Sequence, residues 1–142
     1  MGLSEEEKTI LIDLKIERAN EAIGEVPYLV DQGFYRTAAN RLYYACYYVV
    51  SALLLQKGYK AHTHSGIIAL FSMNFVKTGI VSSAEGKLYR SLFELRLTGD
   101  YDEVKIIDKE DVITRMQPAE QFIKTIEQLI FKNIDNDIDT TC

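Results

Sequence analysis

Two segments of the sequence, one towards each end, repeat the same spacing of apolar residues. In the first segment, steps of 4, 3, 4, 3 and 4 connect Ile12, Ile16, Ala19, Ile23, Val26 and Val30. In the second segment, the same steps connect Val112, Met116, Ala119, Ile123, Ile126 and Ile130. Such steps place all the side chains on one stripe of an α-helix, which has about 3.6 residues per turn. We therefore expect long amphipathic helices at residues 5–32 and from about residue 108 onward.

The residues next to these two stripes carry signals for helix ends and for irregularity. Ser4 and Glu7 have the S-x-x-E spacing of a capping box, and Gly33 follows the last apolar position of the first stripe. Proline lacks the backbone N–H of a helical hydrogen bond. Pro27 therefore predicts a kink or a short break in the first long helix, and Pro118 predicts a bend in the last one.

The middle of the chain predicts further helices. A second helix is expected over residues 35–57. It is apolar on nearly every face from Leu42 to Leu55, which is typical of the central helix of a bundle or of a helix at a subunit interface. A third helix is expected over residues 63–79, with Thr63 or Ser65 as its N-cap, and a fourth from Ser82 or Ser83 to about Leu97. The predicted fold is all-α, an up-and-down antiparallel helical bundle of four main helices with a fifth or broken helix.

Composition and charge limit the organisation and the partners of the chain. With 142 residues, 47% hydrophobic, the chain is long enough for one compact domain, which we place at residues 1–134, before an acidic C-terminal tail at residues 135–142. The net charge is -5, yet residues 33–98 hold eight basic and two acidic residues. This basic middle suits a local anion site. The acidic N-terminus lacks the bases of a secretory signal, and no apolar run suits a membrane span, so we expect a cytoplasmic protein.

Arg96 and Arg41 are the basic side chains best placed to bind a phosphate. Arg96 lies at the predicted end of a helix, where its planar guanidinium can bind a phosphate or pair with Asp100 or Glu94. Arg41 lies within the apolar segment 35–57, and a buried charge costs several kcal/mol unless it is paired. We therefore expect Arg41 to pair with a ligand, a neighbouring subunit or one of four acids: Glu17, Glu21, Glu94 or Asp100.

Aromatic and histidine side chains accompany the two arginines. Four tyrosines form two i, i+4 pairs that suit core packing or stacking on nucleobases: Tyr43, Tyr44, Tyr47 and Tyr48. His62 and His64 lack a third ligand at suitable spacing, so the sequence predicts no metal site. His64, at the start of a helix, is instead a candidate proton donor, phosphate contact or helix cap. Nucleotide-loop, zincin and esterase motifs are absent from the sequence, and no cofactor is expected.

The order of these motifs resembles the HEPN domain family of prokaryotes. The resemblance rests on the run from Gly33 to Gly79, with its YYA and HSG motifs, and on the R-x-x-x-D-Y pattern of LFELRLTGDYDE. It covers about residues 10–130. It implies a helical bundle that pairs into a homodimer with a polar cleft at the interface. It also implies a small nucleotidyltransferase as partner in a toxin and antitoxin pair.

Many members of that family are metal-independent ribonucleases with a signature of an arginine, a polar residue and a later histidine. Arg96 matches the arginine, but Leu97 replaces the polar residue and residues 101–103 are Tyr, Asp and Glu. Tyr101 is a poor base at neutral pH, because a tyrosine has a pKa of about 10. Tyr101 could still orient a phosphate, and His64, from another helix, could supply the proton transfer that ribonuclease activity needs.

Together, these observations predict a dimeric HEPN-type protein that binds nucleotide or RNA phosphate and acts with a nucleotidyltransferase. The candidate catalytic residues are Arg96, Tyr101 and His64. The candidate phosphate-binding residues are Arg41, Tyr44 and Asp100. Whether the protein is an enzyme is left open at this point. The alternative is a non-catalytic dimerisation or assembly module whose arginines pair within the protein.

Overall fold

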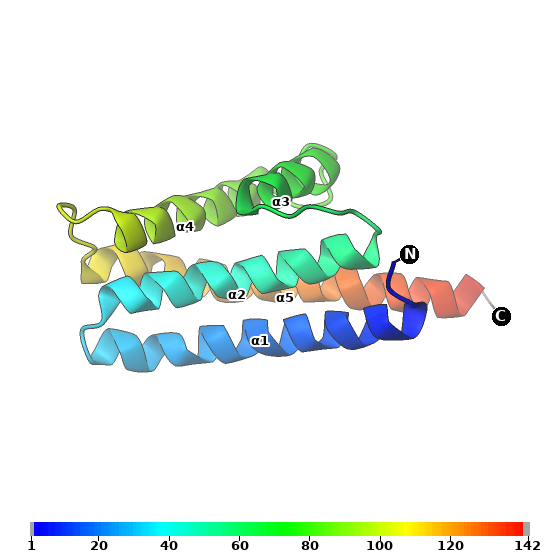
Figure 1. The fold of residues 1–142 in the computed structure, drawn as a ribbon, viewed down its shortest axis with the longest axis horizontal. Helices are drawn as coiled ribbons and strands as arrows, with labels where there is room; N and C mark the ends of the chain where they lie inside the picture. The colour runs from blue at the N-terminus through cyan, green and yellow to red at the C-terminus, as the bar shows by residue number, and fades with distance from the viewer. Residues whose placement is uncertain (1, 141–142) are drawn as a thin grey trace.

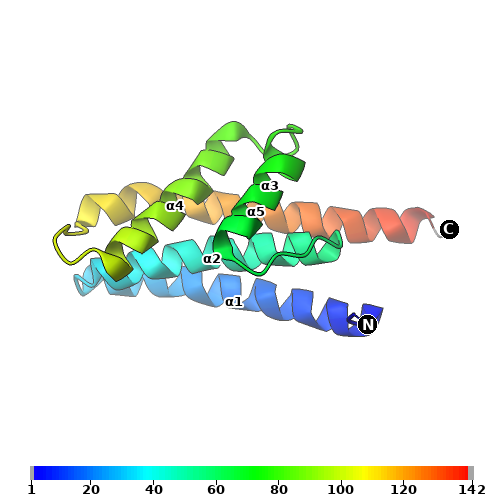
Figure 2. The same cartoon turned by 45° about the horizontal axis from the view of Figure 1, so that its top comes forward.

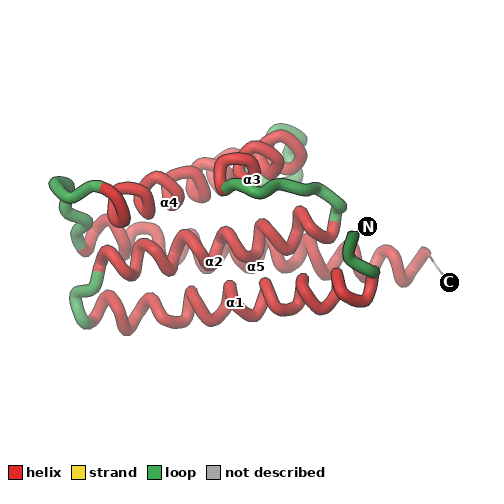
Figure 3. Tube along the Cα trace, viewed as in Figure 1, coloured by secondary structure: helices red, strands yellow, loops and turns green. Residues whose placement is uncertain are grey.

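The protein consists of helices and the loops that connect them. The computed structural model describes the backbone of residues 2–140 and the side chains of residues 2–132. Its helices are α1 (Glu5–Asp31), α2 (Tyr35–Gln56), α3 (His64–Phe71), a π-helix (Ser72–Val76), α4 (Ser83–Tyr101) and α5 (Lys109–Thr140). Within residues 2–140 there is no β-strand (Figure 3), which confirms the all-α class. The end of the predicted tail, residues 141–142, lies outside the described residues.

Helix α2 is the centre of the bundle. It contacts α1, α3, α4 and α5, and α1, α2 and α5 lie alongside one another while α3 and α4 cover α2 (Figure 1). The second view shows α3 and α4 crossing α2 obliquely (Figure 2). Helices α1 and α4 run opposite to α2 and α5, as the up-and-down prediction requires. The apolar surface of α2 is thus explained by its place inside a single chain.

Most of the predicted helix ends are confirmed. In the capping box before α1, the Glu7 amide donates to Ser4 Oγ and the Ser4 amide donates to Glu7 Oε1, each over 3.1 Å. Gly33 follows α1 with a φ of 79°, a conformation that glycine adopts without strain. Of the alternative N-caps, Thr63 starts α3 and Ser82 starts α4.

Two expectations about helix continuity are corrected. The short break that Pro27 allowed does not occur, since α1 continues through this proline, as α5 does through Pro118. Each proline removes only one backbone donor, and buried residues on either side keep the helix packed on its neighbours. The third helix is also shorter than predicted: α3 ends at Phe71, and the chain continues to Val76 as a π-helix.

Helix α4 is longer than predicted, and Gly99 explains the difference. The sequence placed the helix end near Leu97, before a glycine-containing turn, but α4 continues to Tyr101. A Cβ atom on Gly99 would lie 2.7 Å from Cδ1 of Ile107 and 3.2 Å from Cγ of Arg36. Gly99 therefore permits close packing inside the helix and does not form a turn.

Candidate functional site

Arg96 of α4 lies among aromatic rings supplied by α2 and α4. Arg96 is almost completely buried, with only 7% of its surface exposed. The guanidinium carbon is 5.1 Å from the ring centre of Tyr43, 5.6 Å from that of Tyr44 and 5.7 Å from that of Phe93. Cation–π contacts of this kind stabilise a charge by about 0.5–2 kcal/mol. We call the following residues the Arg96 cluster: Arg96, Tyr43, Tyr44, Tyr47, Phe93 and His64.

The polar contacts of Arg96 are few and long. Its Nη1 donates to the Tyr44 hydroxyl over 3.4 Å and lies 3.6 Å from Oδ2 of Asp100, one helical turn further on. Its Nε is buried and has no hydrogen-bond partner among the described residues. Leaving a buried charged donor unsatisfied is unfavourable by more than about 1–3 kcal/mol. The guanidinium therefore keeps unused capacity for an anion, although Asp100 already provides the ion pair that the sequence allowed as an alternative.

His64, the first residue of α3, joins the cluster from a third helix. Its Nδ1 is 2.7 Å from the hydroxyl oxygen of Tyr43, and its ring centre is 4.8 Å from that of Tyr47. The role of helix cap belongs instead to Thr63, whose Oγ1 accepts a hydrogen bond from the Gly66 amide over 2.9 Å. His64 is therefore free to act as a site residue beside Arg96.

Burial and charge set the protonation of the cluster. Partial burial, and then the positive charge of Arg96, lower the pKa of His64 below its usual value. Burial raises the pKa of Tyr43 far above the usual range, and burial together with Tyr44 and Tyr48 raises the pKa of Tyr47. At neutral pH the histidine is therefore uncharged, these tyrosines keep their protons, and Arg96 carries the positive charge of the cluster.

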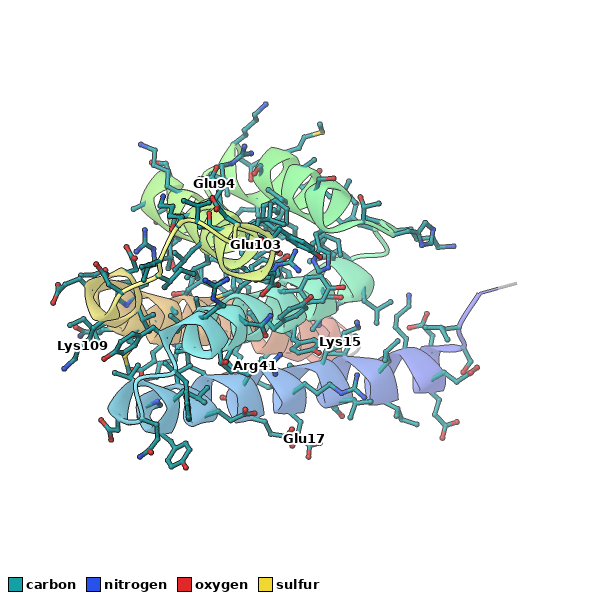
Figure 4. The ribbon with its side chains drawn as sticks, turned by 60° about the vertical axis from the view of Figure 1, so that its left-hand side comes forward. Lys15, Glu17, Arg41, Glu94, Glu103 and Lys109 are labelled. Atoms are coloured by element: carbon teal, nitrogen blue, oxygen red, sulfur yellow. The ribbon has the colours of Figure 1, made fainter. Side chains whose placement is uncertain are left out.

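Arg41 lies next to the cluster but in a different environment from the one predicted. It is half-buried, its Nε and Nη2 donate to Oδ1 of Asn40 over 3.2 and 2.9 Å, and its guanidinium carbon is 5.5 Å from the centre of the Tyr44 ring. Among the described side chains no acid forms an ion pair with Arg41. In Figure 4, Glu17 and Glu94 project outward from α1 and α4, away from Arg41. The predicted acid partner is thus wrong. Partial exposure to water and the side-chain amide of Asn40 are enough to solvate the guanidinium of Arg41.

Two other sequence candidates lie apart from the cluster. Tyr101 is 74% exposed at the end of α4, and none of the described hydrogen bonds or aromatic contacts involves it. His62 is exposed in the loop before α3.

Among residues 2–132, no three histidine, cysteine or acidic side chains are grouped so that they could hold a metal ion. In the described chain, none of the helices combines the length and apolar character needed to cross a membrane.

Sequence reasoning missed three features of the site. Phe93 stands one turn before Arg96 on the same helix, so its i, i+3 spacing was a signal that could have identified it. The bond between Tyr43 and His64 joins residues 21 positions apart, and no spacing rule predicts it. Arg36 donates from Nη1 to the carbonyl oxygen of Gly99 and so connects the start of α2 to the end of α4.

Comparison with known proteins places this chain in a family. The HEPN domain model matches residues 12–129. A Thermotoga maritima protein called "UPF0332 protein" is 43% identical over 87% of this chain and 94% of its own length. Two Methanocaldococcus jannaschii proteins, called "Putative toxin MJ0142" and "Putative toxin MJ0605", are 33% and 30% identical over 84% of this chain and over 82% and 88% of their own lengths. The helical bundle, the matched residues and these relatives together show that the chain belongs to the HEPN domain family.

Proposed function

We propose that this protein is a toxin-like HEPN protein that binds the phosphate of a nucleotide or RNA strand at the Arg96 cluster. The observation that carries the proposal is the guanidinium of Arg96, which is buried, positively charged and incompletely hydrogen-bonded. Half-buried rings next to it, Tyr44 and Tyr47, offer surfaces on which a base can stack. The toxin-like role is supported by the names of two of the relatives.

We further propose that the protein works as a homodimer in the cytoplasm together with a small nucleotidyltransferase. The half-buried residues of α2 support the dimer, because a second copy packed at their edge would leave them lining a cleft between the copies that a ligand can still enter: Arg41, Tyr44, Tyr47 and Tyr48. Tyrosine and arginine are enriched at such interfaces. Light scattering after size-exclusion chromatography should give twice the 16.2 kDa mass of the chain. Co-purification from cells that express a neighbouring nucleotidyltransferase gene tests the partner, and its absence from the purified complex contradicts that part.

The decisive experiment compares two arginines of α4. We expect Arg96→Ala to weaken binding of AMP and of a short single-stranded RNA about tenfold to a hundredfold, since a hydrogen bond to a charged group contributes about 1.5–3 kcal/mol. Arg90→Ala removes the same charge from an exposed position of the same helix and should change affinity much less. Fluorescence anisotropy and calorimetry measure the affinities, and circular dichroism checks the fold. Equal effects of the two substitutions, or no binding by the unmodified protein, would contradict the proposal.

A second candidate function is a non-catalytic assembly module. It is favoured by the contacts of Arg96 with Asp100 and Tyr44, which satisfy part of its charge within the chain. In that case Arg96→Ala should lower the free energy of unfolding without any effect on a ligand. Chemical denaturation of the same variant, carried out beside the binding assay, separates the two functions.

A further inference from the structure

We propose that Tyr43 is a positioning residue that holds His64 in the tautomer with its proton on Nε2. His64 then offers an N–H donor, and no proton acceptor, to an oxyanion next to Arg96. The ligand part of this inference rests on the proposed function. The tautomer itself follows from contacts within the protein and can be tested without any ligand.

The first step concerns the hydroxyl hydrogen of Tyr43. Tyr43 is completely buried, and the hydrogen bond described for its hydroxyl joins it to Nδ1 of His64. A buried hydroxyl that lacks an acceptor costs about 1–3 kcal/mol. Nδ1 is an acceptor only when it carries no proton, and the proton of a neutral imidazole is then on Nε2.

The opposite arrangement leaves a buried hydroxyl without an acceptor. If Nδ1 carried the proton and donated to Tyr43, the Tyr43 hydroxyl would have to point elsewhere. The guanidinium of Arg96 has no acceptor. The ring of Tyr89 is stacked on that of Tyr43, and burial, the neighbouring Tyr43 and donation of its own hydrogen to Tyr43 raise the pKa of Tyr89. When Tyr43 donates to Nδ1, its oxygen is free to accept this hydrogen. Donation from Tyr43 to Tyr89 would leave the hydrogen of Tyr89 without an acceptor, so the arrangement with Nε2–H is favoured.

The second step concerns the charge of His64. The groups that face its ring come from α2 and α4, and they are aromatic: Tyr43, Tyr44, Tyr47 and Phe93. The neighbouring charge is Arg96, which is positive and opposes a second proton on the ring. No described hydrogen bond or ion pair joins His64 to a carboxylate. The neutral ring is therefore the stable form near pH 7.

As a consequence, the groups that the site offers to a ligand are hydrogen-bond donors. Arg96 contributes guanidinium N–H groups, and His64, which is close enough for the charge of Arg96 to lower its pKa, contributes Nε2–H as a further donor. A phosphate oxygen accepts hydrogen bonds from both groups, so phosphate esters are the class of ligand that this arrangement fits. A ring nitrogen that already carries a proton cannot remove one from a 2'-hydroxyl. Cleavage of RNA at this site would therefore need a base other than His64, such as the carboxylate of Asp100 beside Arg96 or a group from a second copy.

Nitrogen NMR of the imidazole rings tests the tautomer directly. The chain has two histidines, so His64→Gln identifies the signals of His64, and exposed His62 serves as an internal reference. At pH 7.5 we expect the Nε2 signal of His64 to be typical of N–H and the Nδ1 signal to be typical of an unprotonated acceptor. A protonated Nδ1, or the same tautomer ratio as that of exposed His62, overturns the inference.

Two tyrosine variants test the positioning role. Tyr43→Phe removes the hydroxyl that bonds Nδ1, so the His64 signals should move towards a tautomer mixture and the affinity for AMP should fall severalfold. Tyr89→Phe removes a similarly buried hydroxyl that acts on Tyr43 but has no hydrogen bond to His64, so both readouts should change much less than in Tyr43→Phe. Equal effects of the two variants on the His64 signals overturn the inference. The expected tautomer in a protein that binds no AMP, phosphate or RNA overturns the proposed function alone.

A rescue pair adds a test that does not depend on Tyr43. Glutamine can place an amide N–H where Nε2–H lies, whereas asparagine is too short to do so. His64→Gln should therefore keep more of the affinity for AMP than His64→Asn. Weaker binding by the glutamine variant than by the asparagine variant contradicts the donor role. Circular dichroism and thermal unfolding of both variants confirm that the comparison is made between folded proteins.

Discussion

Two parts of the bundle pack on the same central helix with different kinds of side chain. Helices α1 and α5 bury mainly small and aliphatic residues against α2, such as Ala19, Val26 and Ile126. The layer formed by α3, the π-helix and α4 buries aromatic rings and one arginine, among them Phe71, Tyr89 and Arg96. Helices α1 and α5 therefore form a regular hydrophobic part, which we call the support. The layer of α3, the π-helix and α4 holds the charged side chain of Arg96 in place.

The difference teaches where the stability and the candidate chemistry of this protein lie. Aliphatic packing is favourable in proportion to the apolar area it buries and has no directional polar demands. The aromatic layer buries hydroxyl groups and a guanidinium, which must be satisfied by specific partners. Substitutions in the two parts should therefore produce different effects, and three predictions test this.

The largest effect is expected for a core substitution in the support. Ile126 is fully buried on α5, so Ile126→Ala should lower the free energy of unfolding by about 2–5 kcal/mol through lost burial and a residual cavity. Ile113→Ala on the same helix is the control, because Ile113 is 36% exposed. Urea denaturation measures both, and AMP affinity per folded molecule should stay unchanged. A similar loss for the two variants would show that α5 does not belong to the core as described.

Smaller effects on the free energy of unfolding, opposite in sign to each other, are expected for alanine substitutions of two glycines inside helices. Gly24 of α1 has open space where a Cβ would be, so Gly24→Ala should stabilise the protein by about 0.5–1 kcal/mol. Gly99→Ala in α4 should destabilise it by about 1 kcal/mol, because the new Cβ would meet Ile107 and Arg36. Thermal unfolding of the pair checks the signs. Stabilisation by both substitutions would show that the end of α4 is not tightly packed.

The smallest effect is the pH dependence that His64 adds. Its folded-state pKa lies below the unfolded value of about 6.5, so the unfolded chain binds more protons just below that pH. Stability should therefore decrease as the pH falls from about 6.5 to the lowered pKa of His64, and His64→Gln should remove this decrease. The further loss at lower pH should persist, because hydrogen bonds lower the pKa of Glu7 and Asp102. Denaturation midpoints measured across this range provide the test.

The regular support could be predicted from the sequence almost completely. The apolar stripe from Ile12 to Val30 identifies the buried face of α1, and Ser4 and Gly33 mark its ends. These are local signals, since each depends on residues within one or two turns. Even there, the continuity through Pro27 depends on packing against other helices, and the sequence does not report that packing.

The site could be predicted only in part. Arg96, Tyr44 and His64 were identified as candidates, and the structure brings them together. The predicted ion pair of Arg41 with an acid was wrong. The face of α2 that remains open to water depends on how α1 and α4 pack, and the sequence does not show that packing. The bond between Tyr43 and His64 depends on the path of the loop at residues 57–63, which is set by tertiary contacts. Local patterns therefore find the residues but not their partners.

The ring of Tyr44 has a consequence for the size of ligand that this protein can accept. Its centre lies 5.5 Å from the guanidinium carbon of Arg41 and 5.6 Å from that of Arg96, so one phenol separates two like charges. A single anion arriving there relieves the repulsion between both cations, while the chain as a whole carries a charge of -5. The two arginines therefore attract an anion at short range, while the net negative charge of the chain repels it at long range. If the proposed function holds, we therefore expect a short or single-stranded phosphate ligand to bind better than an extended duplex.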